Sequence, residues 1–259
     1  MPHKISPNDI KSCLQTETFG REIYCHDSLD STMNEASRIA LNGVKEGTVV
    51  IAESQTKGRG RFGRNWVSPA GSGIYLSIVL RPTLAANEIP KLTLLASVAV
   101  CQAIQKVVGF KTKIKWPNDL LVNQKKLAGF LTEMNSNSGY QSSVILGMGI
   151  NVNSALSDLP EHSTSIKNEI GKNVSRVELI IEILSLMEKW YIDVNTHGFS
   201  TVMKNWKELS ETLGRRVRID DSTRVWEGKA VDLDSSGGLM IENDEGTIIR
   251  SMTGDVVEL

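Results

Sequence analysis

The segment from Thr56 to Trp66, TKGRGRFGRNW, combines positive charge with glycine. Its basic residues, with no acidic residue among them, are Lys57, Arg59, Arg61 and Arg64. Cations beside backbone that a ligand can approach closely suit a carboxylate or a phosphate. Trp66 is suited to stack on a base, and a core tryptophan is the alternative. The segment therefore predicts an anion and nucleotide site, with a solvated basic turn or an unspecific nucleic-acid patch as the alternatives.

Gly58, Gly60 and Gly63 also have the G-x-G-x-x-G spacing of a dinucleotide-binding turn. That turn needs a helix that begins within it and an acidic residue about 20 positions later. Here the glycines are followed by Pro69 and then by a β-branched segment, and no acidic residue occurs between Glu53 and Glu88. The dinucleotide interpretation therefore fails.

A second group of polar residues lies around KWPNDLLVNQKKLAGFLTE. Lys115, Asn118, Asp119 and Lys126 fall within twelve positions. Because Pro117 favours an extended residue before it, the Asn-Asp pair is expected at the entrance of a strand. A plain turn is the alternative for this pair.

The elements that must position these residues indicate an α+β fold. A capped helix is predicted over 30–43, where Glu35 follows Thr32 by three positions, and longer helices over 89–109, from Ser175 onward and over 199–214. Short strands are predicted at 21–27, 47–54, 73–80, 111–116, 119–123, 126–134 and 142–152, with a turn at 123–126. The hairpin-rich middle predicts a mixed, largely antiparallel sheet with helices on one side. Residues 151–173 are expected to form a long loop, of the kind that serves as a lid or is mobile.

Two domains are predicted from a change of character near Gly214. Residues 1–213 carry the elements above, whereas 214–259 contain only short strands joined by Asp-Ser, Ser-Gly-Gly and Glu-Gly turns, which predicts a small β-barrel. The net charge of −1 argues against nucleic acid as the main partner. Three scattered cysteines indicate neither disulfides nor a zinc site, and no apolar run of membrane-spanning length is expected. A cytoplasmic protein is predicted.

Together with DSTMNEA and GMGIN, the two segments resemble the biotin protein ligase family from about Tyr24 to Leu213. The final domain is also similar to the C-terminal domain of that family. The resemblance implies a class II synthetase-like core with an SH3-like barrel. It also implies an enzyme that uses ATP, Mg²⁺ and biotin to form biotinyl-5′-AMP. The biotinyl group then passes to a lysine of the biotin carboxyl carrier domain of acetyl-CoA carboxylase or a related carboxylase.

The resemblance also implies roles for matching positions. Side chains implied for the biotin head are Ser31, Thr32 and Gln55, of which Ser31 or Thr32 is equally a helix cap. Backbone implied to complete that pocket lies near Met33, Arg59 and Gly60; many relatives carry asparagine in place of Met33. Arg61 and Lys126 would be catalytic, facing the biotin carboxylate and the α-phosphate. The remaining implied contacts to ATP are Arg64, Trp66, Lys115, Asn118, Asp119 and Asn151, with Asp119 and Asn151 as Mg²⁺ ligands.

Two related functions are the alternatives. A lipoate ligase shares the fold and the adenylation chemistry, but not the G-R-G-R-x-G-R-x-W segment. A biotin-responsive repressor needs an N-terminal DNA-binding module of about 60 residues, and only about 22 precede the first expected strand. We therefore expect a short form without that module, with no nucleic-acid or membrane partner, and with a homodimer through the core sheet as an open possibility.

Overall fold

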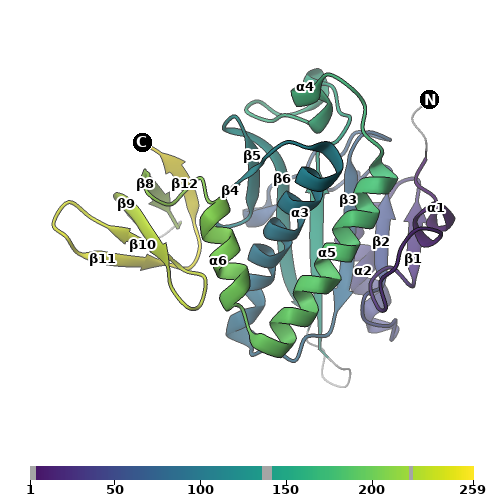
Figure 1. The fold of residues 1–259 in the computed structure, drawn as a ribbon, viewed down its shortest axis with the longest axis horizontal. Helices are drawn as coiled ribbons and strands as arrows, with labels where there is room; N and C mark the ends of the chain where they lie inside the picture. The colour runs from purple at the N-terminus through teal and green to yellow at the C-terminus, as the bar shows by residue number, and fades with distance from the viewer. Residues whose placement is uncertain (1–3, 136–141, 222–223) are drawn as a thin grey trace.

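The computed structural model describes residues 4–135, 142–221 and 224–259. A seven-stranded sheet has the order β1-β2-β3-β7-β6-β5-β4 (Figure 1). Its strands are β1 Ile23–His26, β2 Val49–Ala52, β3 Ile74–Leu80, β4 Lys113–Lys115, β5 Asp119–Val122, β6 Lys125–Asn135 and β7 Ser143–Ile150. Only the β1–β2 pair is parallel among these described pairings. The predicted mixed, largely antiparallel sheet is confirmed.

Three helices cover one face of this sheet, as Figure 1 shows. They are α3 Leu92–Val108, α5 Arg176–His197 and α6 Ser200–Leu209. The predicted caps are present, because Ser175 Oγ accepts a hydrogen bond from the backbone of Glu178, and Gly109 ends α3 in the left-handed conformation. Short elements complete the core: α1 Pro7–Lys11, η1 Arg61–Gly63, η2 Ala86–Lys91, η3 Leu156–Asp158 and α4 Ile166–Ile170.

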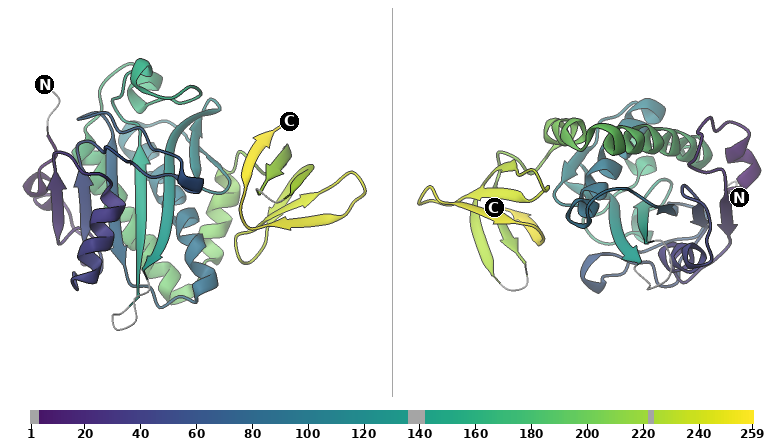
Figure 2. Two further views of the ribbon diagram at one scale, coloured as in Figure 1. Left: turned by 180° about the vertical axis from the view of Figure 1, so that it is seen from behind. Right: turned by 90° about the horizontal axis from the view of Figure 1, so that it is seen from below.

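Helix α2, Thr32–Leu41, packs on the opposite face of the sheet (Figure 2, left). Its Met33, Ala36 and Ile39 form a second buried cluster with strand residues that include Val50 and Ile145. The expectation of helices on one side only is therefore wrong. The apolar stripe of α2 is short, and nothing in it distinguishes one face of a sheet from the other.

Two further expectations are corrected. Residues 151–173 are not simply a loop: they contain η3 and α4, Ser154 and Ser165 are fully buried, and the backbone of Thr164 bonds to Lys126. The predicted turn at 123–126 covers only Asn123 and Gln124, whose φ angles of 48° and 62° reverse the chain within two residues, so that β6 begins at Lys125.

The segment Ala86–Val108 is long and apolar enough to cross a membrane by length and composition, contrary to expectation. Its helix α3 is the central core helix, in which Leu92, Leu95 and Val98 have no exposed surface. Burial against the sheet accounts for this apolar composition.

A separate antiparallel sheet forms the C-terminal part and lies beside β4 and α6 (Figures 1 and 2). It has the order β11-β10-β9-β8-β12, with β8 Arg216–Asp220, β9 Val225–Leu233, β10 Leu239–Glu242, β11 Ile248–Ser251 and β12 Asp255–Glu258. The predicted Asp221-Ser222 turn lies partly outside the described residues. Trp116 Nε1 donates to Gly237 O at 3.0 Å and so joins the two sheets. A domain boundary after residue 213 stays a prediction.

Candidate adenylation site

Three glycines form a surface without side chains on the α2 face of the large sheet. Gly129 in β6 pairs with Gly149 in β7, and Gly147 lies two residues before Gly149 on the same face. A Cβ at Gly149 would collide with the indole of Trp66, and one at Gly147 would lie 2.7 Å from Met33. Glycine is therefore required here so that Trp66 and Met33 can approach the strands closely, and both side chains line a pocket together with these glycines.

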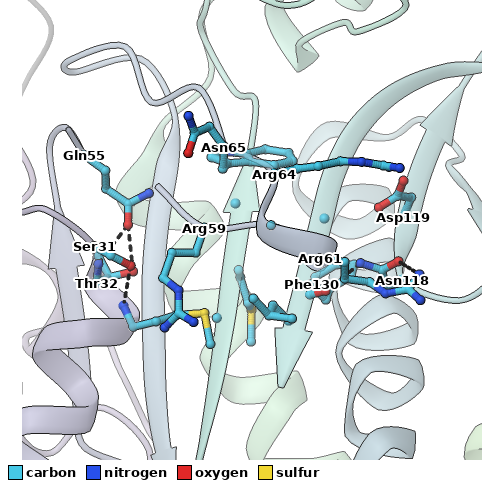
Figure 3. A pocket seen from close by; sticks show the side chains of 18 of the residues that line it. Ser31, Thr32, Gln55, Arg59, Arg61, Arg64, Asn65, Asn118, Asp119 and Phe130 are labelled. Carbon is cyan, nitrogen blue, oxygen red and sulfur yellow. Dashed lines mark hydrogen bonds between the residues drawn. The ribbon is translucent and has the colours of Figure 1, made fainter. Parts of the chain in front are cut away.

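This pocket gathers most of the residues implied for biotin and ATP. From that set it is lined by Ser31, Thr32, Met33, Gln55, Arg59, Gly60, Arg61, Arg64, Trp66, Asn118, Asp119 and Lys126. Figure 3 shows Ser31, Thr32 and Gln55 together at one end, and Arg61, Asn118 and Asp119 at the other. The pocket thus has a hydroxyl- and amide-rich end and a charged end.

The arginine loop, residues 57–66, lies across this pocket as a closed hairpin. Trp66 N donates to Gly58 O at 2.9 Å, and Gly60 N donates to Arg64 O at 2.7 Å. Gly58 has no room for a side chain, because a Cβ there would meet Trp66 O. The tip turns through Phe62 and Gly63, with φ angles of 54° and 71°. The glycines therefore serve a tight reversal and not a phosphate-binding helix start.

At the amide-rich end, Gln55 is bonded to the start of α2. Its Oε1 accepts from Thr32 N at 2.8 Å and from Thr32 Oγ1 at 3.2 Å. Ser31 is the N-cap of the helix, with Oγ accepting from Met33 N. Ser31 and Thr32 are almost fully buried. Ser31 is thus both a cap and a pocket residue, so the two interpretations of this position are compatible.

At the charged end, Arg61 bridges the core and the C-terminal sheet. Its guanidinium donates to Asn118 Oδ1 at 3.2 Å, to Thr253 Oγ1 at 2.8 Å and to Gly254 O at 3.3 Å. Burial lowers the pKa of Arg61 from its usual value, although an arginine stays charged at neutral pH. A partly desolvated cation in this place is suited to meet an anionic ligand.

Arg64 and Lys126 each have an acidic partner. The Arg64 guanidinium pairs with the carboxylate of Asp255, and this hydrogen bond raises the pKa of Arg64. Lys126 Nζ lies 2.8 Å from Asp119 Oδ1 and 5.5 Å from the centre of the Trp66 ring. As predicted, Asp119 stands at the entrance of strand β5, directly after the Trp116–Pro117 turn.

Two implied residues lie outside this pocket. Lys115 and Asn151 line an adjoining cavity on the other side of Trp66, which shares Arg64, Trp66 and Lys126 with the first. Asn151 is 3 % exposed, its amide nitrogen donates to Thr164 O, and its Oδ1 is buried without a hydrogen-bond partner among the described residues. A buried amide oxygen without a partner marks a place for a ligand donor or cation.

The Arg59 side chain is held by polar groups of α2 and β6. Its guanidinium bonds to both carboxylate oxygens of Glu133, at 2.5 and 2.9 Å, and to Asn34 Oδ1 at 3.1 Å. Arg59 and Gly60 both line the pocket, and the roles implied for their backbone stay a prediction. The side chain thus ties the arginine loop to β6 and α2.

Several pocket residues were missed by the sequence interpretation. They are Asn65, Gly129, Phe130, Leu131, Gly147, Met148, Gly149 and Asp255. GMGIN belongs to the motifs that carry the family resemblance, but nothing in its local sequence indicates that its glycines face the pocket. Asp255 is 191 residues from Arg64, and its short strand has the composition of any edge strand.

Comparison with known proteins identifies the family. Residues 25–151 match the biotin/lipoate A/B protein ligase family, and residues 212–257 match the biotin protein ligase C-terminal domain. The bifunctional ligase/repressor BirA of Bacillus subtilis is 41 % identical over 95 % of this chain and 77 % of its own length. The chain belongs to the biotin protein ligase family.

The same family assignment follows from relatives whose names do not include a repressor function and from solved structures. The biotin--[acetyl-CoA-carboxylase] ligase of Paracoccus denitrificans is 30 % identical over 84 % of this chain and 92 % of its own length. A biotin protein ligase from Aquifex aeolicus in complex with biotin and ATP superposes with a TM-score of 0.81 at 28 % identity, covering 92 % of this chain and 99 % of the other. The predicted family and fold are confirmed.

Proposed function

We propose that this member of the family is an ATP-dependent biotin protein ligase. The observation that carries the proposal is the division of one pocket into an end built from Thr32 and Gln55 and an end built from Arg61, Lys126 and Arg64. The first end offers neutral hydrogen-bonding groups for a ureido ring, and the second offers cations for a carboxylate and phosphates. Between them, the glycine surface leaves room for an apolar chain.

The first step joins biotin to AMP. A biotin carboxylate oxygen attacks the α-phosphorus of ATP, a new P–O bond forms, and the bond to the bridging oxygen breaks so that pyrophosphate leaves. Both reactants are anionic, so Arg61 and Lys126 offset their repulsion and hold them in line. Arg64 at the mouth of the pocket binds the outer phosphates, in exchange for Asp255.

The adenine is assigned to the cavity beside Trp66. This cavity has Lys115 and Asn151 in its wall. Stacking of a base on an aromatic ring contributes about 1–3 kcal/mol. The same indole faces Lys126, so that it separates the base from the reacting groups.

Magnesium belongs to the proposal as the partner of ATP. Asp119 and Asn151 would supply the carboxylate and amide oxygens that Mg²⁺ prefers. Within the described part of the chain, Asn151 Oδ1 is buried without a hydrogen-bond partner, which fits this assignment. Asp119 Oδ1 already contacts Lys126, so a cation would share that carboxylate with the lysine. When bound, Mg²⁺ neutralises phosphate charge.

In the second step, an acceptor lysine takes the biotinyl group. Its neutral ε-amine attacks the acyl carbon, the C–O bond to AMP breaks, and the amine loses a proton. Until then the mixed anhydride must be kept from water, which is the role we assign to the closed arginine loop. The proposed acceptor is a biotin carboxyl carrier domain of acetyl-CoA carboxylase or a related carboxylase, as the names of the relatives suggest.

One experiment tests the activity directly. The protein is incubated with ATP and Mg²⁺ and with either biotin or lipoate, and the adenylate is identified by mass. Biotinyl-AMP with biotin, and no acyl-AMP with lipoate, is the expected result. Lipoyl-AMP as the main product would replace the proposal by a lipoate ligase, and the absence of both adenylates would contradict it.

Three further points stay proposals. A cytoplasmic location accords with three cysteines that are free in this structure. The division into residues 1–213 and 214–259 is tested by expressing the first part alone and measuring its fold and adenylation. A homodimer through the core sheet is tested by the molar mass in solution with and without biotin and ATP.

A further inference from the structure

Two buried serines that no role above uses are bonded to the amide-rich end of the pocket. Ser68 Oγ accepts from Gln55 Nε2 at 2.9 Å and donates to Trp66 O at 3.1 Å. Ser77 Oγ, in strand β3, donates to Thr32 Oγ1 at 2.9 Å. Ser68 is 9 % exposed and Ser77 is not exposed at all. Both hydroxyls are therefore largely shielded from bulk water.

These bonds fix the direction of the Gln55 amide. A backbone N–H can only donate, so the Gln55 atom at 2.8 Å from Thr32 N must be the oxygen. The amide nitrogen then faces Ser68, whose own proton is committed to Trp66 O. One amide hydrogen of Gln55 is used in this bond, and the second is left for a ligand acceptor.

The hydroxyl of Thr32 is fixed in the same way. It accepts the proton of Ser77 and gives its own proton to Gln55 Oε1. One lone pair on Thr32 Oγ1 remains for a ligand donor. The subsite thus presents one donor, from Gln55, and one acceptor, from Thr32, on neighbouring side chains.

We propose that Ser68 and Ser77 are positioning residues that set the donor–acceptor polarity of the biotin-head subsite, so that it accepts a ureido group with its C=O toward Gln55 and an N–H toward Thr32. The inference rests on the proposed function. Ser68 also links this subsite to the base of the arginine loop, because its bond to Trp66 O lies beside the Trp66 N to Gly58 O bond.

The test uses Ser68→Ala and Ser77→Ala in the full chain, with Ser72→Ala as the matched control. Ser72 lies in the same segment, and its hydroxyl likewise donates to a backbone carbonyl, that of Pro69, but it has no bond to Gln55. Calorimetry gives the Kd of biotin and of 2-iminobiotin, whose protonated form has a donor in place of the ureido oxygen. Pyrophosphate exchange gives the KM of ATP.

We expect each alanine variant to bind biotin about tenfold more weakly, the effect of one hydrogen bond, with the KM of ATP within about twofold of wild type. In Ser68→Ala the preference for biotin over protonated 2-iminobiotin should narrow, because the Gln55 amide nitrogen loses its acceptor and the amide is then held by Thr32 alone. A merely structural role would weaken both ligands equally. Ser72→Ala should resemble wild type in every measurement.

Ser68→Cys and Ser77→Cys keep the shape of the side chain but make weaker hydrogen bonds. Their affinity for biotin should therefore lie between those of the wild-type protein and the alanine variants, and they replace an alanine variant that fails to fold. Unchanged biotin affinity in folded Ser68 and Ser77 variants, or an unchanged preference over 2-iminobiotin in the folded Ser68 variant, overturns the inference. Failure of the wild-type protein to form biotinyl-AMP would instead overturn the proposed function, so the two failures are distinguishable.

Discussion

Lys126 Nζ lies 2.8 Å from Asp119 Oδ1, across the β5–β6 hairpin and at the charged end of the pocket. The β-bulge between Leu120 and Leu121 shifts the register here, so that Lys126 pairs with Leu121 and Asp119 with Gly129. The carboxylate holds the ammonium beside the Trp66 ring, where the biotin carboxylate and the α-phosphate are proposed to meet. Asp119 thus positions the Lys126 ammonium, which can then form ion pairs with the ligand anions.

Lys126→Ala should reduce biotin-dependent pyrophosphate exchange by at least about 100-fold, because one preorganised charge donor at the reacting anions is lost. The matched control is Lys125→Ala, which removes the exposed neighbouring lysine at the start of the same strand. It should retain wild-type exchange. Since Lys126 is partly exposed, its loss should leave the thermal midpoint nearly unchanged. Near-normal exchange by Lys126→Ala would remove this residue from the chemistry.

Arg61→Gly should release the adenylate. This change removes contacts to Asn118, Thr253 and Gly254 and adds a further glycine to a loop that must stay closed. We expect adenylate to be formed and to leave the enzyme at least about tenfold faster, measured by the decay of bound radiolabelled adenylate on filters. Lys57→Gly, at an exposed position of the same loop, is the control for added flexibility. Equal retention by Arg61→Gly and wild type would contradict the assignment.

The Arg59–Glu133 ion pair should help to hold the arginine loop closed against β6. Arg59→Ala and Glu133→Ala each break the same two hydrogen bonds between the loop and β6. Because both side chains are more than a third exposed, we expect only about two- to fivefold faster release of adenylate. The double variant should be no faster than either single variant. Additive effects in this cycle would show that the two residues act independently.

Most elements of the fold were predictable from the sequence, because the signals that begin and end them lie within a few neighbouring residues. The Ser175 cap with Glu178, and Gly109 at the end of α3, each fix a helix end by a contact of short range. The face on which α2 packs could not be predicted, since its stripe of Met33, Ala36 and Ile39 suits either face. The pairing of distant segments, and not local propensity, decides that position.

The site was predictable where its chemistry is carried by charged side chains close together, as in the arginine loop and at Asp119 and Lys126. It was not predictable where function depends on long-range proximity or on a missing side chain. Asp255 reaches Arg64 only after the C-terminal sheet has packed beside the core. Gly129 and Gly149 are needed because they leave space for Trp66. The residues next to them in the sequence give no sign of this contact.

Substitutions at different glycines of this surface should therefore affect the two substrates differently, one weakening ATP binding and the other weakening biotin binding. In Gly149→Ala, the new Cβ collides with the Trp66 indole and displaces it from the adenine cavity. Loss of base stacking worth about 1–3 kcal/mol predicts a rise of roughly 5- to 150-fold in the KM of ATP, with the Kd of biotin within about threefold of wild type.

Gly147→Ala is the matched change two residues earlier, where the new Cβ lies 2.7 Å from Met33 and not near Trp66. It should weaken biotin binding and leave the KM of ATP nearly unchanged, because Met33 lies at the amide-rich end. Calorimetry with biotin and pyrophosphate exchange over a range of ATP concentrations measure both effects. Separate subsites require opposite effects of the two variants on the Kd of biotin and the KM of ATP. If both variants raised both values to the same extent, the glycines would instead support the sheet as a whole.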